Sequence, residues 1–209
     1  YPKRLSNIYH APGVLYVRGK LPFDHVPTIA IVGARDCSTD GRELANYFAR
    51  ELSKQGVQVV SGMAKGIDSF AHRAALGHQG GTYAVLGSGI DVCYPRENIQ
   101  LYMDIIESGG VISEYNLGIR PFQGNFPMRN RIISGLSDGI LLVEARERSG
   151  SLITMEYGLE QGKNIYACPG RIFDQLSCGT NQIIQQGGKL VLSVKDILED
   201  FNIQAEIIG

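Results

Sequence analysis

The sequence has no long hydrophobic run and no export signal. No stretch approaches the length of about 18 apolar residues that a membrane-spanning helix needs, so we expect no membrane association. The chain opens on Tyr1-Pro2, without an initiator methionine and without a basic-apolar leader. We interpret it as a fragment of a longer cytoplasmic protein.

Cysteines are few, and their spacing does not suggest a shared site. The 4 cysteines are scattered, form no CxxC pair and have no histidine pair nearby: Cys37, Cys93, Cys168 and Cys178. This spacing argues against a zinc site and against a disulfide framework. We therefore expect no bound metal, and four thiols kept in a reducing compartment.

The common catalytic and nucleotide-binding motifs are missing as well. The sequence contains no GxxxxGK[ST], no HExxH and no clear carboxylate dyad. Gly87-Ser88-Gly89 begins like a dinucleotide loop, but Val92 stands at the third glycine of GxGxxG. Residues 135–139 match GxSxG, yet they follow a helix and precede a strand, the reverse of a nucleophile elbow. We expect a binding protein with no cofactor and no enzymatic activity.

Charge of either sign is not in excess. The 209 residues include 20 Lys and Arg against 21 Asp and Glu, for a formal net charge of −1. This balance argues against a uniformly basic protein that coats nucleic acid, but it permits a local basic cleft.

Short apolar strands alternate with helices along most of the chain. Because these strands are continuously apolar, the pattern predicts a mostly parallel sheet covered by helices on both faces, a three-layer α/β fold. The expected strands are Ile29–Val32, Val57–Val60, Thr82–Leu86, Val111–Ile112, Ile140–Val143 and Asn164–Ala167.

The chain divides into three unequal parts. Residues 1–27 carry four prolines and form a lead-in segment that we expect to pack on the domain, with a short strand at Val14–Val17. Residues 28–201 form the α/β domain, which ends in a strand at Leu190–Leu192 and a helix at Val194–Phe201. Residues 202–209 are interpreted as a linker or tail.

Ligands of open α/β sheets bind at the carboxyl ends of the strands, and two loops there carry candidate residues. Gly33 allows close approach to the backbone, and Arg35 follows it as a phosphate-binding candidate; the alternative for Arg35 is a surface pair with Asp36 or Asp40. The next loop offers Ser61 and Gly62 as an anion site and Lys65 as a cation.

The helix after that second loop contains two polar residues that we interpret as structural. Asp68 stands where a helix N-cap belongs. His72 has no nucleophile or metal partner in the sequence, so a structural hydrogen bond to a neighbouring loop is favoured over catalysis.

The segment Phe126–Arg131 combines an aromatic ring with cations. Pro127 suits the first position of a helix. Arg129 and Arg131, on either side of Asn130, point about 200° apart on a helix, so one is expected to contact phosphate and the other to hold a neighbouring loop. Phe126 is either a core residue or a platform for stacking a base, and the spacing does not decide between them.

A helix start at Ser149-Gly150-Ser151 is the strongest anion candidate. Free backbone N–H groups and the helix dipole favour an anion there, and Arg146 and Arg148 precede it. The alternative is ordinary N-capping by a serine.

Five motifs in this order resemble the bacterial DNA-processing protein A (DprA, or Smf) family: VGAR, SGMAKGIDSFAH, AVLGSGIDVCYP, FPMRNRIISGLSD and ERSGSLITMEYGLEQGKNIYACPG. The resemblance runs from Tyr1 to Phe201. It implies an extended Rossmann-like domain that binds single-stranded DNA, protects incoming strands during natural transformation and loads the RecA recombinase. It also implies a homodimer formed through the C-terminal part of the domain, where we expect Ile183 and Ile184 to be partly exposed on a monomer.

The resemblance also assigns roles to single residues. Arg35 matches the family's DNA-binding arginine, and Phe126 matches a position that can stack a base. Several relatives have a lysine where this chain has Gln123, a loss that Lys65 or Arg129 would have to offset. The DNA-binding set implied here is Gly33, Arg35, Lys65, Phe126, Arg129, Asn130 and Arg131, with anion contacts from Ser61, Gly62, Ser149, Gly150 and Ser151.

Two alternatives remain at this point. The run GSLITME is similar to the loop PGGxGTxxE of the lysine-decarboxylase-like nucleoside-monophosphate phosphoribohydrolases, the LOG family. Here Glu156 lies one residue too close and the PGG is absent. The other alternative is a sensor of small nucleotides that signals through its dimer.

Overall fold

The computed structural model describes residues 1–203 and contains one eight-stranded sheet with the order β1-β5-β4-β3-β2-β6-β7-β8. Neighbouring strands are parallel except for β1, which pairs antiparallel with β5 at one edge. The strands are β1 (Tyr16–Gly19), β2 (Thr28–Val32), β3 (Gln58–Ser61), β4 (Thr82–Val85), β5 (Gly110–Ser113), β6 (Gly139–Leu142), β7 (Asn164–Ala167) and β8 (Lys189–Leu190).

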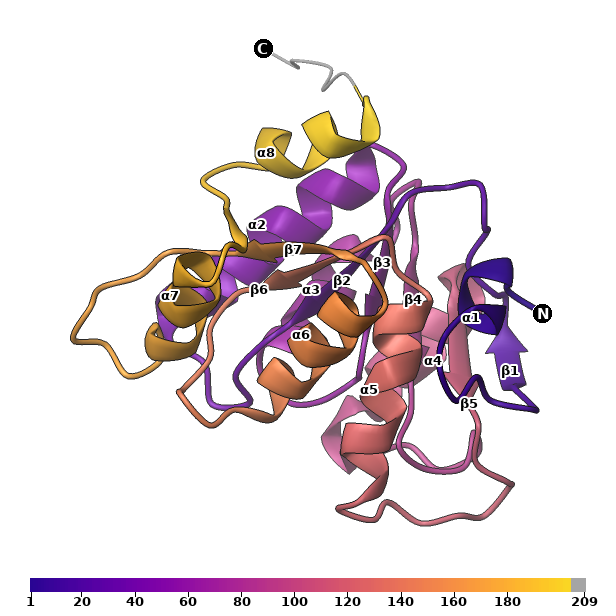
Figure 1. Ribbon diagram of the computed structural model, residues 1–209. Helices are drawn as coiled ribbons and strands as arrows, with labels where there is room; N and C mark the ends of the chain where they lie inside the picture. Colours follow the sequence, from indigo (N-terminus) through magenta and orange to yellow (C-terminus); the bar gives the residue numbers. More distant parts are fainter. Residues whose placement is uncertain (204–209) are drawn as a thin grey trace.

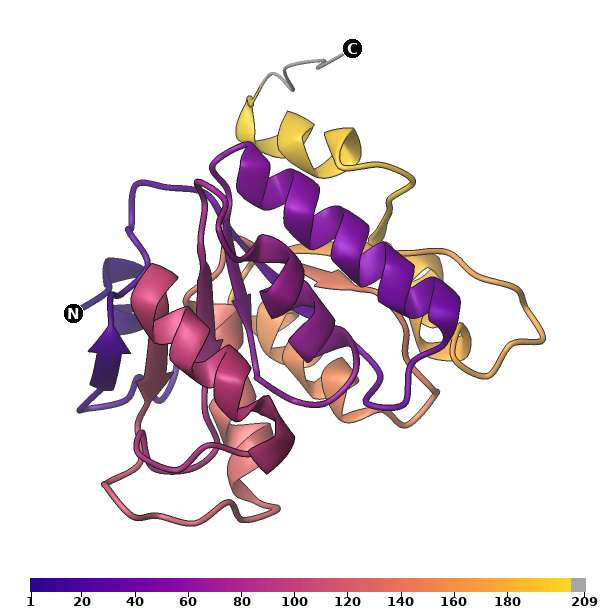
Figure 2. The same ribbon diagram turned by 180° about the vertical axis from the view of Figure 1, so that it is seen from behind.

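Helices lie on both faces of the sheet, as the sequence predicts. The front face in Figure 1 carries α1, α5, α6 and α7, and the view from behind in Figure 2 shows α2, α3 and α4. The helices are α1 (Lys3–Ser6), α2 (Thr39–Lys54), α3 (Ile67–Ala75), α4 (Ile99–Ser108), α5 (Asn125–Gly135), α6 (Gly150–Glu160), α7 (Cys178–Gln185) and α8 (Lys195–Leu198), with 3-10 turns at Arg96–Asn98 and Glu199–Phe201.

Alternate side chains of the central strand point to opposite faces of the sheet and pack into the two halves of the core. In β2, Ile29 and Ile31 pack under α2 and α3, whereas Ala30 and Val32 pack under α5 and α6. Every residue of β2 is buried, which explains why the strand reads as a continuous apolar run rather than as an alternating pattern. The three-layer α/β fold is therefore confirmed.

The strand order reverses beside β2. The chain runs outward from β2 through β3, β4 and β5, and then returns with β6 on the other side of β2. The loops that follow β2 and β6 consequently diverge at one edge of the sheet, which is where open α/β sheets leave a crevice for ligands. This reversal fixes the position of the site described below.

The two edges of the sheet differ in detail from the sequence-based expectation. The first strand is Tyr16–Gly19 rather than Val14–Val17, and the last is Lys189–Leu190 rather than Leu190–Leu192. Short edge strands pair on one side only, so their apolar pattern is a weak guide to their limits. Most of the tail at 202–209 lies outside the described residues.

Leu5 connects the lead-in segment to the main core. Its side chain is fully buried, and its Cδ1 lies only 2.7 Å from where a Cβ at Gly135 of α5 would stand. Ile8 packs against the same glycine. The lead-in therefore contributes apolar side chains to the layer formed by α5.

We expect Leu5→Ala to lower the free energy of unfolding by about 2–5 kcal/mol, because it empties a fully buried site. Urea unfolding followed by circular dichroism measures this change. Tyr9→Ala is the matched control, since its ring is 83% exposed, and it should have little effect. A Leu5→Ala protein as stable as the parent would show that the Leu5 side chain does not stabilise the core.

Candidate nucleic-acid interface

A pocket of about 630 Å³ opens at the sheet edge where the strand order reverses. This volume is within the usual range for ligand sites. Its walls come from the loops after β2 and β6, the segment before α5, and the first turns of α5 and α6. Three segments that the sequence places far apart, Gly33–Asp36, Phe126–Asn130 and Arg148–Thr154, therefore share one cavity.

Arg35 and Phe126 both line this pocket and contact each other. The guanidinium carbon of Arg35 lies 5.6 Å from the centre of the Phe126 ring, within cation–π range. Tyr94 adds a second ring, 5.7 Å from that of Phe126 and inclined by 33°. In residues 1–203, Arg35 makes no ion pair with Asp36 or Asp40, so the alternative of a surface pair is not what the structure shows.

The Phe126 ring is half-buried and is held from below. A Cβ at Gly87 would stand 2.7 Å from Cδ1 of Phe126, so the ring rests directly on the backbone after β4. Asn125, at the start of α5, donates a hydrogen bond to the Gly87 carbonyl at 3.1 Å. The ring thus has a fixed underside and borders the pocket, which favours the stacking platform over a core residue.

Arg129 lies beneath the pocket and is almost fully buried. Its guanidinium donates to the carbonyl oxygens of Gly62, at 2.8 Å, and Val85, and to Asn130 Oδ1 at 3.1 Å. Its carbon is 5.8 Å from the Phe126 ring centre. Burial lowers the pKa of Arg129 to about 10, so the side chain remains charged at neutral pH. Arg129 borders the pocket, but its main contacts are to protein.

Asp68 is the acidic neighbour of Arg129, and it does not cap its own helix. Gly66 occupies the N-cap of α3, and Asp68 accepts a hydrogen bond from Gly62 N–H at 3.1 Å instead. Burial raises the pKa of Asp68, and the charge of Arg129 opposes that rise. The expectation of an N-cap at Asp68 is therefore wrong, because the carboxylate is drawn into the buried cluster around Arg129.

Arg131 holds a neighbouring loop rather than facing the pocket. Its two terminal nitrogens each donate to Glu114 at 2.6 Å, and it also donates to the carbonyl oxygens of His10 and Met128. Only 7% of its side chain is exposed. The expectation that one of the two arginines would hold a loop is met by Arg131, and its assignment as a DNA contact is not supported by its position.

The loop after β3 is not an anion site. Ser61 is fully buried and donates to the Ile31 carbonyl at 2.7 Å, and the N–H of Gly62 is bound to Asp68. Lys65 pairs with Glu97 at 2.6 Å, and neither Lys65 nor Ser61 borders the pocket. Ser61 and Gly62 are buried because the neighbouring Met63 packs into the core. Lys65 is exposed at the surface, and the structure places all three residues outside the pocket.

Gly33 allows its backbone to pack closely against α3 and the chain after β6. A Cβ there would stand 2.7 Å from Cγ1 of Ile67 and 2.9 Å from the Glu144 carbonyl oxygen. That same carbonyl accepts a hydrogen bond from Ala34 N–H at 2.8 Å. Gly33 also borders the pocket. Because it has no Cβ, the loop after β2 can approach the residue after β6 closely, and no side chain at this position fills the pocket.

The start of α6 is both capped and open to the pocket. The Ser149 hydroxyl accepts from Ser151 N–H at 3.4 Å, and the two hydroxyls lie 2.7 Å apart. Asn130 Nδ2 donates to the Gly150 carbonyl at 3.3 Å and so joins α5 to this helix start. Ser149 is therefore the N-cap of α6, and all three residues line the pocket, while anion binding by them stays a prediction.

The pocket is positively charged in an otherwise balanced protein. The charged residues that line it are Arg35, Arg129, Arg146, Arg148, Asp36 and Asp68. The positive end of the α6 dipole adds to the four arginines. Tyr94 and Pro121 were missed from the sequence as pocket residues, because nothing in their spacing relates them to Phe126.

His72 is structural, as the sequence favours. The ring is fully buried on α3, and its Nδ1 lies 2.6 Å from the Thr82 hydroxyl oxygen. Burial lowers the pKa of His72 to about 3, so the ring stays neutral in the folded protein. His72 is not among the residues that line the pocket.

We expect the neutral state of His72 to make stability depend on pH. Below about pH 6.5 the unfolded chain binds a proton at His72 that the folded chain excludes, so the free energy of unfolding falls as the pH drops toward 3. The loss is about 2 kcal/mol at about pH 5. Urea unfolding at several pH values should show a shallower dependence for His72→Gln. An NMR titration of His72 with a midpoint near 6 would contradict the assignment.

No described helix is long and apolar enough to cross a membrane. Within the same residues, no group of three or more His, Cys, Asp and Glu side chains is placed to hold a metal ion.

Known proteins with similar sequences share both the motifs and the fold. DNA processing protein DprA of Streptococcus pneumoniae is 46% identical over 201 residues, covering 96% of this chain and 71% of the relative. Protein Smf of Escherichia coli is 44% identical over 201 residues, covering 96% of this chain but 54% of the relative.

Solved structures agree with these matches. The crystal structure of DprA from Streptococcus pneumoniae has a TM-score of 0.91 at 45% identity and covers 98% of this chain and 72% of that one. DNA processing protein A from Helicobacter pylori, described with a single-stranded DNA binding mode, has a TM-score of 0.87 at 27% identity, covering 96% and 92%. A molybdenum cofactor binding protein from Rippkaea orientalis shares the fold alone, with a TM-score of 0.58 at 17% identity.

The family match extends over nearly the whole chain. Residues 1–202 match the family described as DNA recombination-mediator protein A. Together with relatives above 40% identity that align over 96% of the chain, this match shows that the protein belongs to the DNA recombination-mediator protein A family.

Proposed function

We propose that this chain binds single-stranded DNA in the pocket at the sheet edge. The observation that carries the proposal is the pair of exposed Arg35 and half-buried Phe126, a cation and an aromatic face 5.6 Å apart in the lining of a positive pocket. Proteins that bind single strands without sequence preference combine these two elements, a charged groove for the phosphates and a ring on which bases stack.

The lining residues divide between phosphate and base. Ser149–Ser151 at the start of α6 offers hydroxyls and the positive end of a helix to a phosphate. Arg146 and Arg148 stand in the loop before it, both exposed. Phe126 and Tyr94 offer ring faces to a base. Aromatic faces accept any base, so binding should show little sequence preference.

Relatives support the same assignment. The Helicobacter pylori protein, with a TM-score of 0.87, is described with a single-stranded DNA binding mode. The Streptococcus pneumoniae relative is named a DNA processing protein, and the family is described as a recombination mediator. On this basis we extend the proposal to the wider role: in the cytoplasm, the protein protects incoming single strands during natural transformation and loads the RecA recombinase on them.

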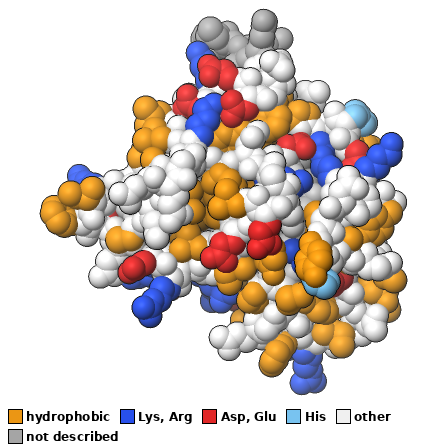
Figure 3. Space-filling model, viewed as in Figure 1, with side chains coloured by type: hydrophobic (Ala, Val, Ile, Leu, Met, Phe, Trp, Pro, Cys, Tyr) orange, Lys and Arg blue, Asp and Glu red, His pale blue; other side chains and the backbone are white. Residues whose placement is uncertain are grey.

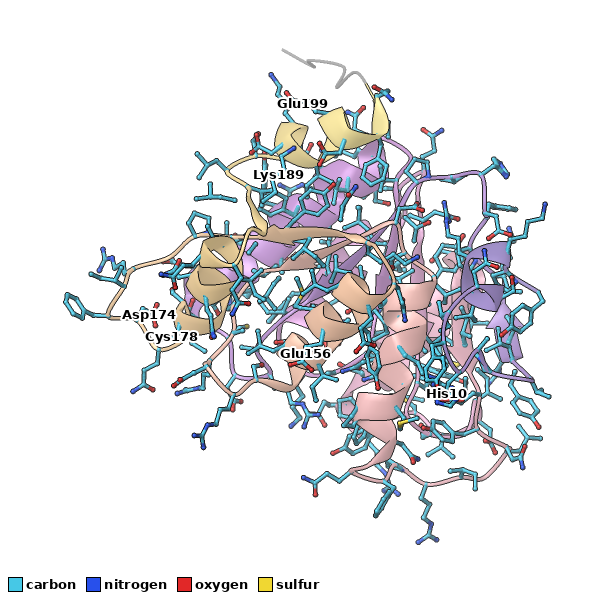
Figure 4. The ribbon with its side chains drawn as sticks, in the orientation of Figure 1. His10, Glu156, Asp174, Cys178, Lys189 and Glu199 are labelled. Atoms are coloured by element: carbon cyan, nitrogen blue, oxygen red, sulfur yellow. The ribbon has the colours of Figure 1, made fainter. Side chains whose placement is uncertain are left out.

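The geometry favours binding over nucleotide hydrolysis. In a phosphoribohydrolase of the LOG type, the glutamate of the helix-start motif has to reach the substrate. Here Glu156 is exposed on α6 and does not border the pocket, whereas Thr154, two residues earlier, does (Figure 4). The α6 residues that line the pocket all belong to the helix start, up to Thr154, and Glu156 lies beyond them.

We further propose that the protein forms a homodimer through α7 and the β8 edge. Ile184 is half-buried in a shallow hollow on α7, and Leu190 and Leu192 are exposed beside it. Figure 3 shows hydrophobic side chains gathered over the β8–α8 connection and at the tip of the β7–α7 loop. Figure 4 labels Cys178 at the start of the same helix. Ile183 is 8% exposed and packs into the core, so the expectation that it is partly exposed is wrong.

Arg35→Ala should weaken binding of a fluorescent oligo-dT by about 1–3 kcal/mol, or about 5- to 150-fold, because it removes both a phosphate contact and the support of the Phe126 ring. Fluorescence anisotropy at several salt concentrations measures this, and the log–log salt slope should fall by about 0.7. Lys65→Ala is the matched control: it removes a cation that is paired with Glu97 outside the pocket. Equal losses in the two variants, or none in Arg35→Ala, would refute the proposed site.

Ile184→Arg should convert the dimer to a monomer in sedimentation velocity, because it places a charge in an apolar interface. Ile99→Arg, at a side chain 53% exposed on α4, is the control and should leave the sedimentation coefficient unchanged. Identical sedimentation of the parent and Ile184→Arg would place the interface elsewhere.

A further inference from the structure

We propose that the strand path continues beyond the pocket onto a second stacking platform formed by Phe122, with Arg120 as its phosphate contact. This inference rests on the proposed function and adds a subsite to it. Phe122 and Arg120 belong to the loop between β5 and α5, which we call the platform loop (residues 116–124). With this second subsite, the surface fits a longer strand rather than a single nucleotide.

Phe122 is exposed to an extent that packing does not explain. Its side chain is 68% exposed, although burial of an aromatic ring is worth about 1.5–3 kcal/mol. Leu117, 64% exposed, and Ile119, 41% exposed, lie in the same loop. Figure 3 shows hydrophobic and basic side chains together at the lower end of the molecule, over the segment that leads into α5.

The ring is presented by a fixed backbone. A Cβ at Gly124 would stand 3.0 Å from Cε1 of Phe122, so the ring lies against the Gly124 backbone. The Phe122 carbonyl accepts a hydrogen bond from Asn125 N–H at 2.9 Å, which fixes the turn into α5. A ring that is already held in place loses little conformational entropy when a base stacks on it.

Further anchors hold the rest of the platform loop. The Ile119 carbonyl accepts from Gly89 N–H at 2.8 Å, and Gly118 N–H donates to Asp91 at 2.9 Å. Tyr16 of β1 donates its hydroxyl hydrogen to Asn116 Oδ1 at 2.7 Å. The loop is therefore attached to the β4–α4 connection and to β1, and its exposed side chains project from a supported backbone.

The platform loop adjoins the pocket, and this position identifies the ligand that Phe122 would bind. Pro121 and Gln123, the neighbours of Phe122 on either side, line the pocket, while Phe122 itself lies outside it. Arg120 is exposed and, among the described residues, takes part in no ion pair. An aromatic face and a cation next to a positive pocket are the same two residue types that Arg35 and Phe126 supply inside it, so the ligand is the next stretch of the same single strand.

The absence of tryptophan from the chain makes a direct test available. Phe122→Trp would introduce the only tryptophan into a sequence that has none, and a base stacked on an indole quenches its fluorescence. We expect quenching when oligo-dT of about 16 nucleotides binds and little when oligo-dT of about 4 nucleotides binds, because the short strand is held in the pocket. Phe23→Trp is the control, at a ring 52% exposed ahead of the amino end of β2.

Affinity provides the second measurement. Phe122→Ala should weaken binding of the 16-nucleotide strand by about fivefold or more and leave the 4-nucleotide strand unchanged. Arg120→Gln should lower the salt slope for the long strand alone, by about 0.7. Phe23→Ala should change neither affinity.

The outcomes separate this inference from the proposed function. Unchanged affinity of Phe122→Ala for both strands would overturn the second platform while leaving the pocket intact. Equal losses for both strands would also overturn it, because the loop would then act by shaping the pocket. If the fluorescence of Phe122→Trp changed with protein concentration and not with added DNA, the surface would be assigned to contact with a second copy of the chain. Retention of both affinities by Arg35→Ala and Phe126→Ala would refute the proposed function itself.

Discussion

A buried guanidinium organises the ligand-binding edge of this protein. Arg129 joins the ends of β3 and β4 through the carbonyl oxygens of Gly62 and Val85, and it lies behind the Phe126 ring. A charge with so little exposure is tolerated only when its donors are satisfied and a counter-charge is near. Asp68 supplies that counter-charge from α3. The Phe126 ring, which borders the pocket, is therefore positioned by a buried cluster behind it.

The general architecture follows from the sequence, because buried parallel strands such as Ile29–Val32 leave a strong apolar signal and their loops must open on one edge. The sequence does not indicate which of two similar loops faces the pocket. The loops after β3 and before α6 both offer serine and glycine, yet Ser61 is buried and Ser149 faces the pocket. Only the packing of Met63 and the hydrogen bonding of Asp68 distinguish them, and both are tertiary interactions.

The arginines of α5 illustrate the same limit. Helical periodicity requires Arg129 and Arg131 to diverge, and they do. Periodicity does not indicate which one meets the ligand, because that depends on where Glu114 and the lead-in segment lie. Lys65 fails as a prediction for a related reason, since its partner Glu97 is 32 positions away in the sequence. Arg35, three residues after the end of the central strand β2, does line the pocket, as its place in the sequence predicts.

The loop after β6 connects the pocket to α7 through consecutive backbone contacts. Arg146, which lines the pocket, donates to Gln175 at 2.6 Å, while Ala145 N–H donates to the Leu176 carbonyl and Gly179 N–H donates to the Ala145 carbonyl. A ligand that drew Arg146 toward a phosphate would compete with its hydrogen bond to Gln175, in the segment just before α7. Thermodynamic linkage is reciprocal. If a bound strand stabilised an assembly through α7, that assembly would bind the strand more tightly by the same free energy. Strand binding and assembly would then regulate each other without a separate effector.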